Sequence, residues 1–336
     1  MARPIKEFSL AWKALSGYSG GDGWRTLPVA HAGPRGLLAG RRFPGNEEAV
    51  LIRFDSARLP AASTLPSGQG FSVDRVISDD LGEGWLALSR QADGAHELFE
   101  VMVSDVVGVL DACVGSSEAQ TLHSFLSRVR GWQSFMQSGS SGMGPEAELG
   151  LAGELAFLCE LLRAGLGPTF ALQAWVGPLR ESQDFQIGAG AVEVKSTLSG
   201  AGFRAKIGSL DQLDDSTRSP LFLGAARFIE SPAGSALPDL AAAVRDALAA
   251  DVLAVNLFND RLLFAGYVDA HSERFTRRFT LVDLRFFDVS SGFPKLTPAI
   301  VPVGVLRASY EIEVDLASTL PLSSTDVLQR LGVLLA

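Results

Sequence analysis

Cysteine, histidine and lysine are scarce in this 336-residue sequence. It has only two cysteines, Cys113 and Cys159, four scattered histidines and no C-x-x-C pair. Both cysteines lie in apolar segments with helical spacing, so we interpret them as free thiols of a protein in a reducing compartment. This composition argues against a disulfide framework and a structural zinc site, and it predicts a cytoplasmic protein.

Long apolar runs and an excess of positive charge are also missing. No window reaches about 18 uninterrupted apolar residues, so we expect no membrane span. The first residues lack the apolar core and cleavage site of a secretory signal. The formal net charge of −9 argues against a protein that coats nucleic acid by bulk electrostatics. It does not exclude a protein that acts on nucleic acid through a local site, because a carboxylate-lined metal site is itself acidic and a partner can supply affinity for DNA.

The sequence predicts four regions along the chain. They are a β-rich N-terminal domain (1–116), a helix with a flexible linker (117–144), a central core (145–268) and a β-rich C-terminal segment (269–336). In the first two regions we expect strands at 37–39, 49–54, 84–88 and 98–103, and helices at 105–113 and 118–137. The N-terminal region could read DNA, bind a partner or complete the fold.

The core is predicted to begin with a helix and continue with strands. The expected elements are a helix at 146–164, strands at 170–176, 184–187, 191–197 and 221–229, and helices at 237–250 and 252–263. The tail is predicted to form strands at 279–289, 300–305 and 310–314 and a short helix at 325–334.

The strand at 191–197 carries an E-x-K triplet between valines. Because side chains alternate across a sheet, Glu193 and Lys195 are expected on one face and the valines on the other. A single acid-x-Lys triplet is no more than chance supplies, and it is also typical of a solvated edge. The flanking valines are typical of a buried strand, which places the charged pair at the edge of a core.

Asp184 begins the preceding strand, across a Gly-Ala-Gly turn. If the two strands form a hairpin, the returning chain passes Asp184 at residues 193–195. Two carboxylates that close repel each other unless a cation lies between them. Oxygen ligands of this kind suit Mg²⁺ or Mn²⁺. We therefore expect Asp184, Glu193 and the Val194 carbonyl to hold the ion.

Glu154 lies on the apolar stripe of the helix at 146–164, with no lysine or arginine three or four residues away. Such an acid needs a partner, which could be a metal site or a backbone hydrogen bond. Lys195 is one of only five lysines among 29 basic residues. Unlike arginine, a lysine can deprotonate or orient water, and it can stabilise charge on a phosphorane.

These segments together resemble the PD-(D/E)XK nuclease superfamily. The resemblance rests on Gly150–Leu158 around Glu154, on Trp175–Pro178, on Asp184-Phe185 and on Val192–Thr197, and it covers residues 146–225. It implies a restriction-endonuclease-like α/β (α+β) core, in which helices flank a mixed central sheet. Its roles map onto Asp184 and Glu193 as Mg²⁺ ligands, Lys195 as the group that assists the attacking water, and Glu154 as completing the metal site. Gln183, not proline, precedes Asp184, as in diverged members.

The chain most resembles bacterial PD-(D/E)XK motif proteins associated with phage defence. This implies a Mg²⁺-dependent nuclease that hydrolyses DNA and works beside partner subunits such as a helicase or ATPase, and a homo-oligomer is possible. The metal chemistry does not distinguish DNA from RNA. The alternative is a catalytically silent scaffold that keeps the fold and acts by protein contacts, although relatives of that kind usually lose the lysine or an acid.

A polar segment, residues 207–213, follows the E-x-K strand. Superfamily members often place a polar helper here, so Gln212 is a candidate accessory catalytic residue, while a capped helical turn is the alternative. Arg204 and Lys206 could contact phosphate or could be solvated.

Overall fold

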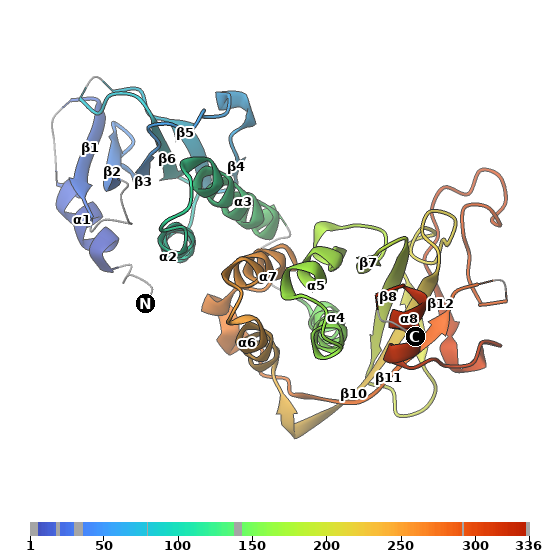
Figure 1. Ribbon diagram of the computed structural model, residues 1–336. Coiled ribbons are helices and arrows are strands. Elements are labelled where there is room, and N and C mark those ends of the chain that lie inside the picture. The colour runs from blue at the N-terminus through green and yellow to red at the C-terminus, as the bar shows by residue number, and fades with distance from the viewer. Residues whose placement is uncertain are drawn as a thin grey trace. The chain divides into compact units, whose positions relative to one another are not determined.

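The computed structural model describes residues 6–17, 21–29, 36–78, 80–137, 143–290 and 292–333. The chain divides into two compact units, Met1–Ser140 and Ser141–Ala336. Figure 1 shows the elements of both. Residues 138–142 of the predicted linker lie outside the described residues.

The first unit is built on a six-stranded sheet with the order β1-β2-β3-β6-β5-β4, in which all neighbours are antiparallel. Its strands are β1 (Gly23–Pro28), β2 (Leu37–Phe43), β3 (Glu47–Arg53), β4 (Ser67–Gly68), β5 (Phe71–Arg75) and β6 (Trp85–Arg90). Its helices are α1 (Lys6–Ser16), α2 (His96–Ala112) and α3 (Glu118–Gln137), with a short 3₁₀ turn η1 (Ala62–Thr64). The six strands confirm the β-rich character predicted for the region. The central strands β3 and β6 are almost wholly buried.

The strand predicted at 98–103 is wrong, because these residues belong to helix α2. Phe99, Met102, Val103, Val106 and Val107 are buried at intervals of three and four, which is the period of one helix face. The helix predicted at 105–113 is the second half of this same helix. The helix predicted at 118–137 is confirmed as α3.

The second unit contains a mixed four-stranded sheet with the order β11-β10-β8-β7. Strand β10 runs parallel to β8, while β7 and β11 are antiparallel to their neighbours. A two-stranded sheet pairs β12 with β9. The strands are β7 (Phe185–Ile187), β8 (Gly190–Thr197), β9 (Arg204–Ile207), β10 (Leu221–Ser235), β11 (Phe279–Asp288) and β12 (Tyr310–Glu313).

Helices flank this sheet, as Figure 1 shows. They are α4 (Pro145–Arg163), α5 (Pro168–Ala174), α6 (Leu237–Leu248), α7 (Val252–Phe264) and α8 (Ser324–Arg330), with 3₁₀ turns η2 (Gly177–Leu179), η3 (Asp269–Arg274) and η4 (Val314–Leu316). The mixed sheet and its helices confirm the predicted α/β (α+β) fold class. A shared hydrophobic core joins residues from α4 to α7, the sheet and α8.

Helix α4 begins and ends where its sequence predicts. Pro145 occupies the first turn, Glu146 and Glu148 place negative charge there, and Arg163 lies in the last turn. The helix packs closely against β8, because a Cβ built on Gly153 would lie 2.0 Å from Ser196 Oγ. A glycine at this position therefore lets the helix that carries Glu154 approach the strand that carries Glu193.

Two strands predicted in this unit are wrong. Residues 170–176 form most of helix α5 and the Trp175 bridge, because Pro168 starts a helix at its first turn. Residues 300–305 form turns, in which Val305 N–H donates to Pro302 O and Gly304 has a φ of +98°. In the described part of the chain, no helix is long and apolar enough to cross a membrane.

Candidate functional site

The hairpin formed by β7 and β8 brings the predicted acids together. Phe185 pairs with Val192, so Asp184, which directly precedes β7, lies opposite the E-x-K strand. The Val194 backbone N–H donates a hydrogen bond of 2.8 Å to Asp184 Oδ2. Gly188, with a φ of +58°, lies in the turn, where a residue with a Cβ would be strained.

Glu193 and Lys195 share one face of β8, as the alternation predicts. Lys195 Nζ lies 2.7 Å from Glu193 Oε1, and the exposed fractions of their side chains are 17% and 1%. Neither Glu193 oxygen meets the geometry of a hydrogen bond to a partner in the described part of the chain. The Lys195 ammonium compensates part of the charge of this buried carboxylate, which would otherwise be costly to bury.

Glu154 has a side-chain partner that sequence reasoning did not identify. Its Oε2 accepts a hydrogen bond of 2.7 Å from the indole Nε1 of Trp175. Trp175 is fully buried between helix α5 and the turn η2, and its ring packs against Phe185 and Phe258. The partner expected for this acid on the apolar stripe of α4 therefore comes from the following helix–turn segment.

Gly177 marks the point on which two of the acids converge. A Cβ built on Gly177 would lie 2.7 Å from Asp184 Oδ1 and 3.1 Å from Glu154 Oε2. The backbone N–H groups of Val176 and Gly177 both donate to the Asp184 carbonyl, at 2.8 and 2.9 Å. The turn η2 is thus fixed to Asp184 through the backbone, and it leaves room for both carboxylates only because residue 177 has no side chain.

Burial raises the pKa of all three acids, and the charges of neighbouring carboxylates raise the pKa of Glu154 and Glu193 further. Burial, with the charge of Asp184 added, raises the pKa of Glu193 to about 8. Burial and the charges of Asp184 and Glu193 raise the pKa of Glu154 well above its usual value, although the Trp175 hydrogen bond lowers it. Burial likewise raises the pKa of Asp184, against the opposing charge of Lys195. Burial alone would lower the pKa of Lys195, but the neighbouring carboxylates raise it overall. A divalent cation bound beside these acids would favour their charged forms and so lower their pKa values.

Gln212 lies beside Lys195, and its amide also serves a turn. Its Oε1 accepts a hydrogen bond of 2.6 Å from Gly208 N–H and lies 3.4 Å from Lys195 Nζ. The accessory catalytic role of Gln212 stays a prediction, and the turn that its amide closes is not helical. Arg204 and Lys206 are largely exposed, and each lies 3.7 Å from an acid, Glu313 and Glu146 respectively. Such pairs are weak, which is typical of solvated side chains.

The family comparison agrees with this geometry. The model of the family described as "Putative PD-(D/E)XK family member, (DUF4420)" matches residues 8–315. The chain belongs to this family. The match confirms the superfamily resemblance and extends it over most of the chain. No curated protein and no solved structure matched the chain.

The donor atoms present in this DUF4420 member could hold an oxygen-liganded cation. Within the described residues, no group of three or more His, Cys, Asp or Glu side chains is arranged to hold a metal ion. Mg²⁺, however, is commonly bound through only one or two carboxylates and keeps several waters. Asp184 Oδ1, which makes no hydrogen bond in the described chain, and the buried Glu193 carboxylate fit that pattern.

The contacts of two further residues near the site are not evident from the sequence. Trp175 lies in one of the segments that carry the family resemblance, but nothing in its spacing identifies it as the partner of Glu154. Gln183 is 2% exposed, and its Nε2 donates a hydrogen bond of 2.8 Å to Asp211 O. A buried glutamine cannot be recognised from sequence, because it depends on a carbonyl 28 residues away.

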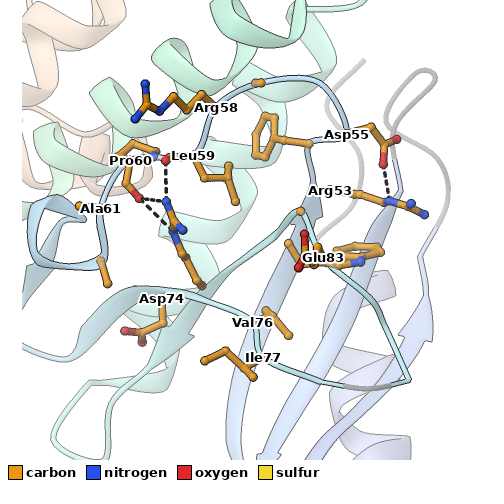
Figure 2. A pocket seen from close by; sticks show the side chains of 16 residues that line it. Arg53, Asp55, Arg58, Leu59, Pro60, Ala61, Asp74, Val76, Ile77 and Glu83 are labelled. Atoms are coloured by element: carbon orange, nitrogen blue, oxygen red, sulfur yellow. Dashed lines mark hydrogen bonds and ion pairs between the residues drawn. The ribbon is translucent and has the colours of Figure 1, made fainter.

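A large cavity lies elsewhere, in the first unit of the family member. It has a volume of about 1280 Å³, and its lining residues are 53–55, 57–62, 74–77 and 83–85. Figure 2 shows the Arg53–Asp55 ion pair at its edge, at 2.7 Å. Three arginines and three acids line it, so it lacks the excess of positive charge that phosphate backbones require. None of the predicted site residues lines this cavity.

Proposed function

We propose that this DUF4420 member is a Mg²⁺-dependent nuclease that hydrolyses phosphodiester bonds of DNA. The observation that carries the proposal is the Glu193 carboxylate, which is 1% exposed, lies beside Asp184, and keeps a pKa raised to about 8 although the Lys195 ammonium lies 2.7 Å from its Oε1. In a buried ion pair that only stabilises a fold, further hydrogen bonds usually satisfy the remaining carboxylate oxygen. An acid left in this state fits a site that is completed by a cation.

Each residue of the site has a distinct part in the proposed reaction. Asp184 and Glu193, with the Val194 carbonyl, would hold the metal, and Glu154 would complete its surroundings. A bound Mg²⁺ lowers the pKa of its water and polarises the scissile phosphate. Lys195, whose pKa the neighbouring carboxylates raise, would act as an ammonium that orients the attacking water and stabilises charge on the phosphorane. Gln212 would fix the position of the Lys195 ammonium.

The proposed cellular role rests on the resemblance and the charge. The resemblance supports a subunit of a bacterial anti-phage defence system, with a helicase or ATPase as partner. A net charge of −9 supports the proposal that a partner subunit supplies the affinity for DNA, because a protein that binds DNA by itself needs a basic surface. RNA shares the phosphodiester chemistry, so both polymers belong in the assay.

The test combines metal binding with cleavage on the same samples. We would titrate Mn²⁺ calorimetrically into the wild type, into Asp184→Ala and into Asp246→Ala, whose exposed acid on α6 makes no side-chain hydrogen bond in the described chain. Plasmid nicking, with and without neighbouring gene products, would follow. We expect Asp184→Ala to lose binding and nicking and Asp246→Ala to keep both. A wild type that binds no Mn²⁺ would refute the nuclease.

One observation favours the scaffold as a second candidate. The described residues include no ready-made cluster of three metal-binding side chains, and Lys195 already neutralises part of the charge of Glu193. A scaffold would bind neither Mn²⁺ nor DNA, yet it would still join its partner subunits. Co-purification of the metal-free protein with those partners, without nicking by the complex, would support this candidate.

A further inference from the structure

A buried hydrogen bond connects the two segments that flank Lys195. Gln183 directly precedes Asp184, and its Nε2 donates to Asp211 O at 2.8 Å. Asp211 directly precedes Gln212, whose Oε1 accepts from Gly208 N–H and lies 3.4 Å from Lys195 Nζ. The start of β7 and the 208–213 turn are thus joined beside the acids by one side chain.

This contact is built into the core of the second unit. Gln183 is 2% exposed, so its amide cannot exchange the carbonyl for water without opening the structure. The proline found at this position in the superfamily pattern has no side-chain donor. Burying a polar side chain costs free energy of folding unless its hydrogen bond is made. Here the acceptor, Asp211 O, lies on the segment that carries Gln212.

We propose that Gln183 is a positioning residue for the site. Its amide fixes the 208–213 turn and, through that turn, holds the Gln212 oxygen beside the Lys195 ammonium. The inference rests on the proposed nuclease function, which it deepens by linking the position of Asp184 to that of Lys195. Outer groups of this kind set the orientation of those that touch the substrate, and losing one costs about 10- to 100-fold in activity or metal affinity.

The variant Gln183→Leu removes the donor while it keeps a similar volume. The fold should persist, because Asp211 O also accepts from Asp214 N–H and because Leu210 and Leu213 are buried beneath the turn. We expect kcat for Mn²⁺-dependent nicking to fall about 10- to 100-fold, with KM and the Kd of Mn²⁺ unchanged. Gln173→Leu, an exposed glutamine on α5, is the matched control and should leave kcat unchanged.

A double-mutant cycle tests whether Gln183 acts through Gln212. In a Gln212→Ala background, Gln183→Leu should cost little more, because the oxygen that it positions is gone. An equal loss of kcat in both backgrounds, or a parallel loss of Mn²⁺ affinity and thermal stability, would make Gln183 a structural residue only and overturn the proposal.

Hydrogen exchange keeps the inference testable without activity. The Gly208 amide should exchange about tenfold faster in Gln183→Leu, the effect of weakening one hydrogen bond. Unchanged protection at Gly208 would overturn the proposal, whereas faster exchange would support it even in a protein that nicks nothing. Failure of the nuclease function itself would be recognised separately, as a wild type that neither binds Mn²⁺ nor nicks.

Discussion

Replacing Gly177 with alanine places one methyl group where two acids converge. The added Cβ would lie 2.7 Å from Asp184 Oδ1, 3.1 Å from Asp184 Cα and 3.1 Å from Glu154 Oε2. Gly177 does not have a positive φ, so alanine brings no backbone strain there. The effect of Gly177→Ala therefore comes from contact alone.

The size of that effect follows from what can move. Non-bonded carbon contacts are optimal at about 3.5–4.0 Å, so the Asp184 carboxylate has to retreat by roughly half an ångström or more. The turn cannot retreat instead without stretching the bonds from Val176 and Gly177 N–H to Asp184 O. Overpacking of this kind costs about 1–3 kcal/mol in the free energy of unfolding. A displacement of about 1 Å at a reacting group costs about 100-fold in rate.

Urea unfolding, Mn²⁺ calorimetry and initial nicking rates on the same samples would measure both effects. The control is Gly150→Ala on helix α4, where a Cβ meets nothing within 4 Å. That variant should gain about 0.5–1 kcal/mol, because alanine is the better helix former. If Gly177→Ala kept the Mn²⁺ affinity and nicking rate of the wild type, the acids around Gly177 would not be the reacting centre.

Three further predictions follow from the contacts of single side chains. The Ser56 hydroxyl and adjacent backbone N–H groups lower the pKa of Glu118 to about 2, so its stabilisation is complete above about pH 4.5 and is lost as pH falls towards 2. In urea unfolding, Glu118→Gln should remove about 1–2 kcal/mol at pH 7 and nothing at pH 2, after allowance for solvent screening. Burial raises the pKa of Glu193 to about 8, so the metal-free protein should lose stability as pH rises from about 4.5 to 8. Mn²⁺ binding at pH 6.5 should release about one proton, measured as a buffer-dependent binding enthalpy that Glu193→Gln abolishes. Trp175→Phe removes the donor to Glu154 and one ring of a fully buried indole, so it should cost at least about 1–3 kcal/mol in urea unfolding; a smaller loss would show that the hydrogen bond to Glu154 contributes nothing to stability.

The hairpin that carries the site was predictable because its signals are local. Alternation places Glu193 and Lys195 on one face, and the Gly-Ala-Gly turn fixes which residues face Asp184. The hydrogen bond from Val194 N–H to Asp184 Oδ2 confirms this register. The metal roles of these residues remain predictions, because they depend on an ion and on a reaction.

Two of the three incorrect strands share one physical cause. Residues 98–103 and 170–176 are short and apolar, and such runs fit a buried strand and a buried helix equally well. Helix α2 was decided by buried residues further along the chain, such as Val106 and Leu110, and α5 by Pro168 at its start. Residues 300–305 are apolar but exposed in turns, with Val303 fully exposed. The composition of residues 300–305 predicts burial, but in the folded protein their turns leave most of them exposed.

The contacts that distinguish a working site from an acidic cluster are long-range in sequence. Trp175 reaches Glu154 across 21 residues, and Gln183 reaches Asp211 across 28. Both donors are buried side chains whose chemistry looks like ordinary core until their acceptors are known. An apolar residue of similar volume at either position would remove the hydrogen bond to Glu154 or to Asp211 O. These two donors therefore fix Glu154 and the segment that carries Gln212, and the proposed chemistry depends on the positions of both.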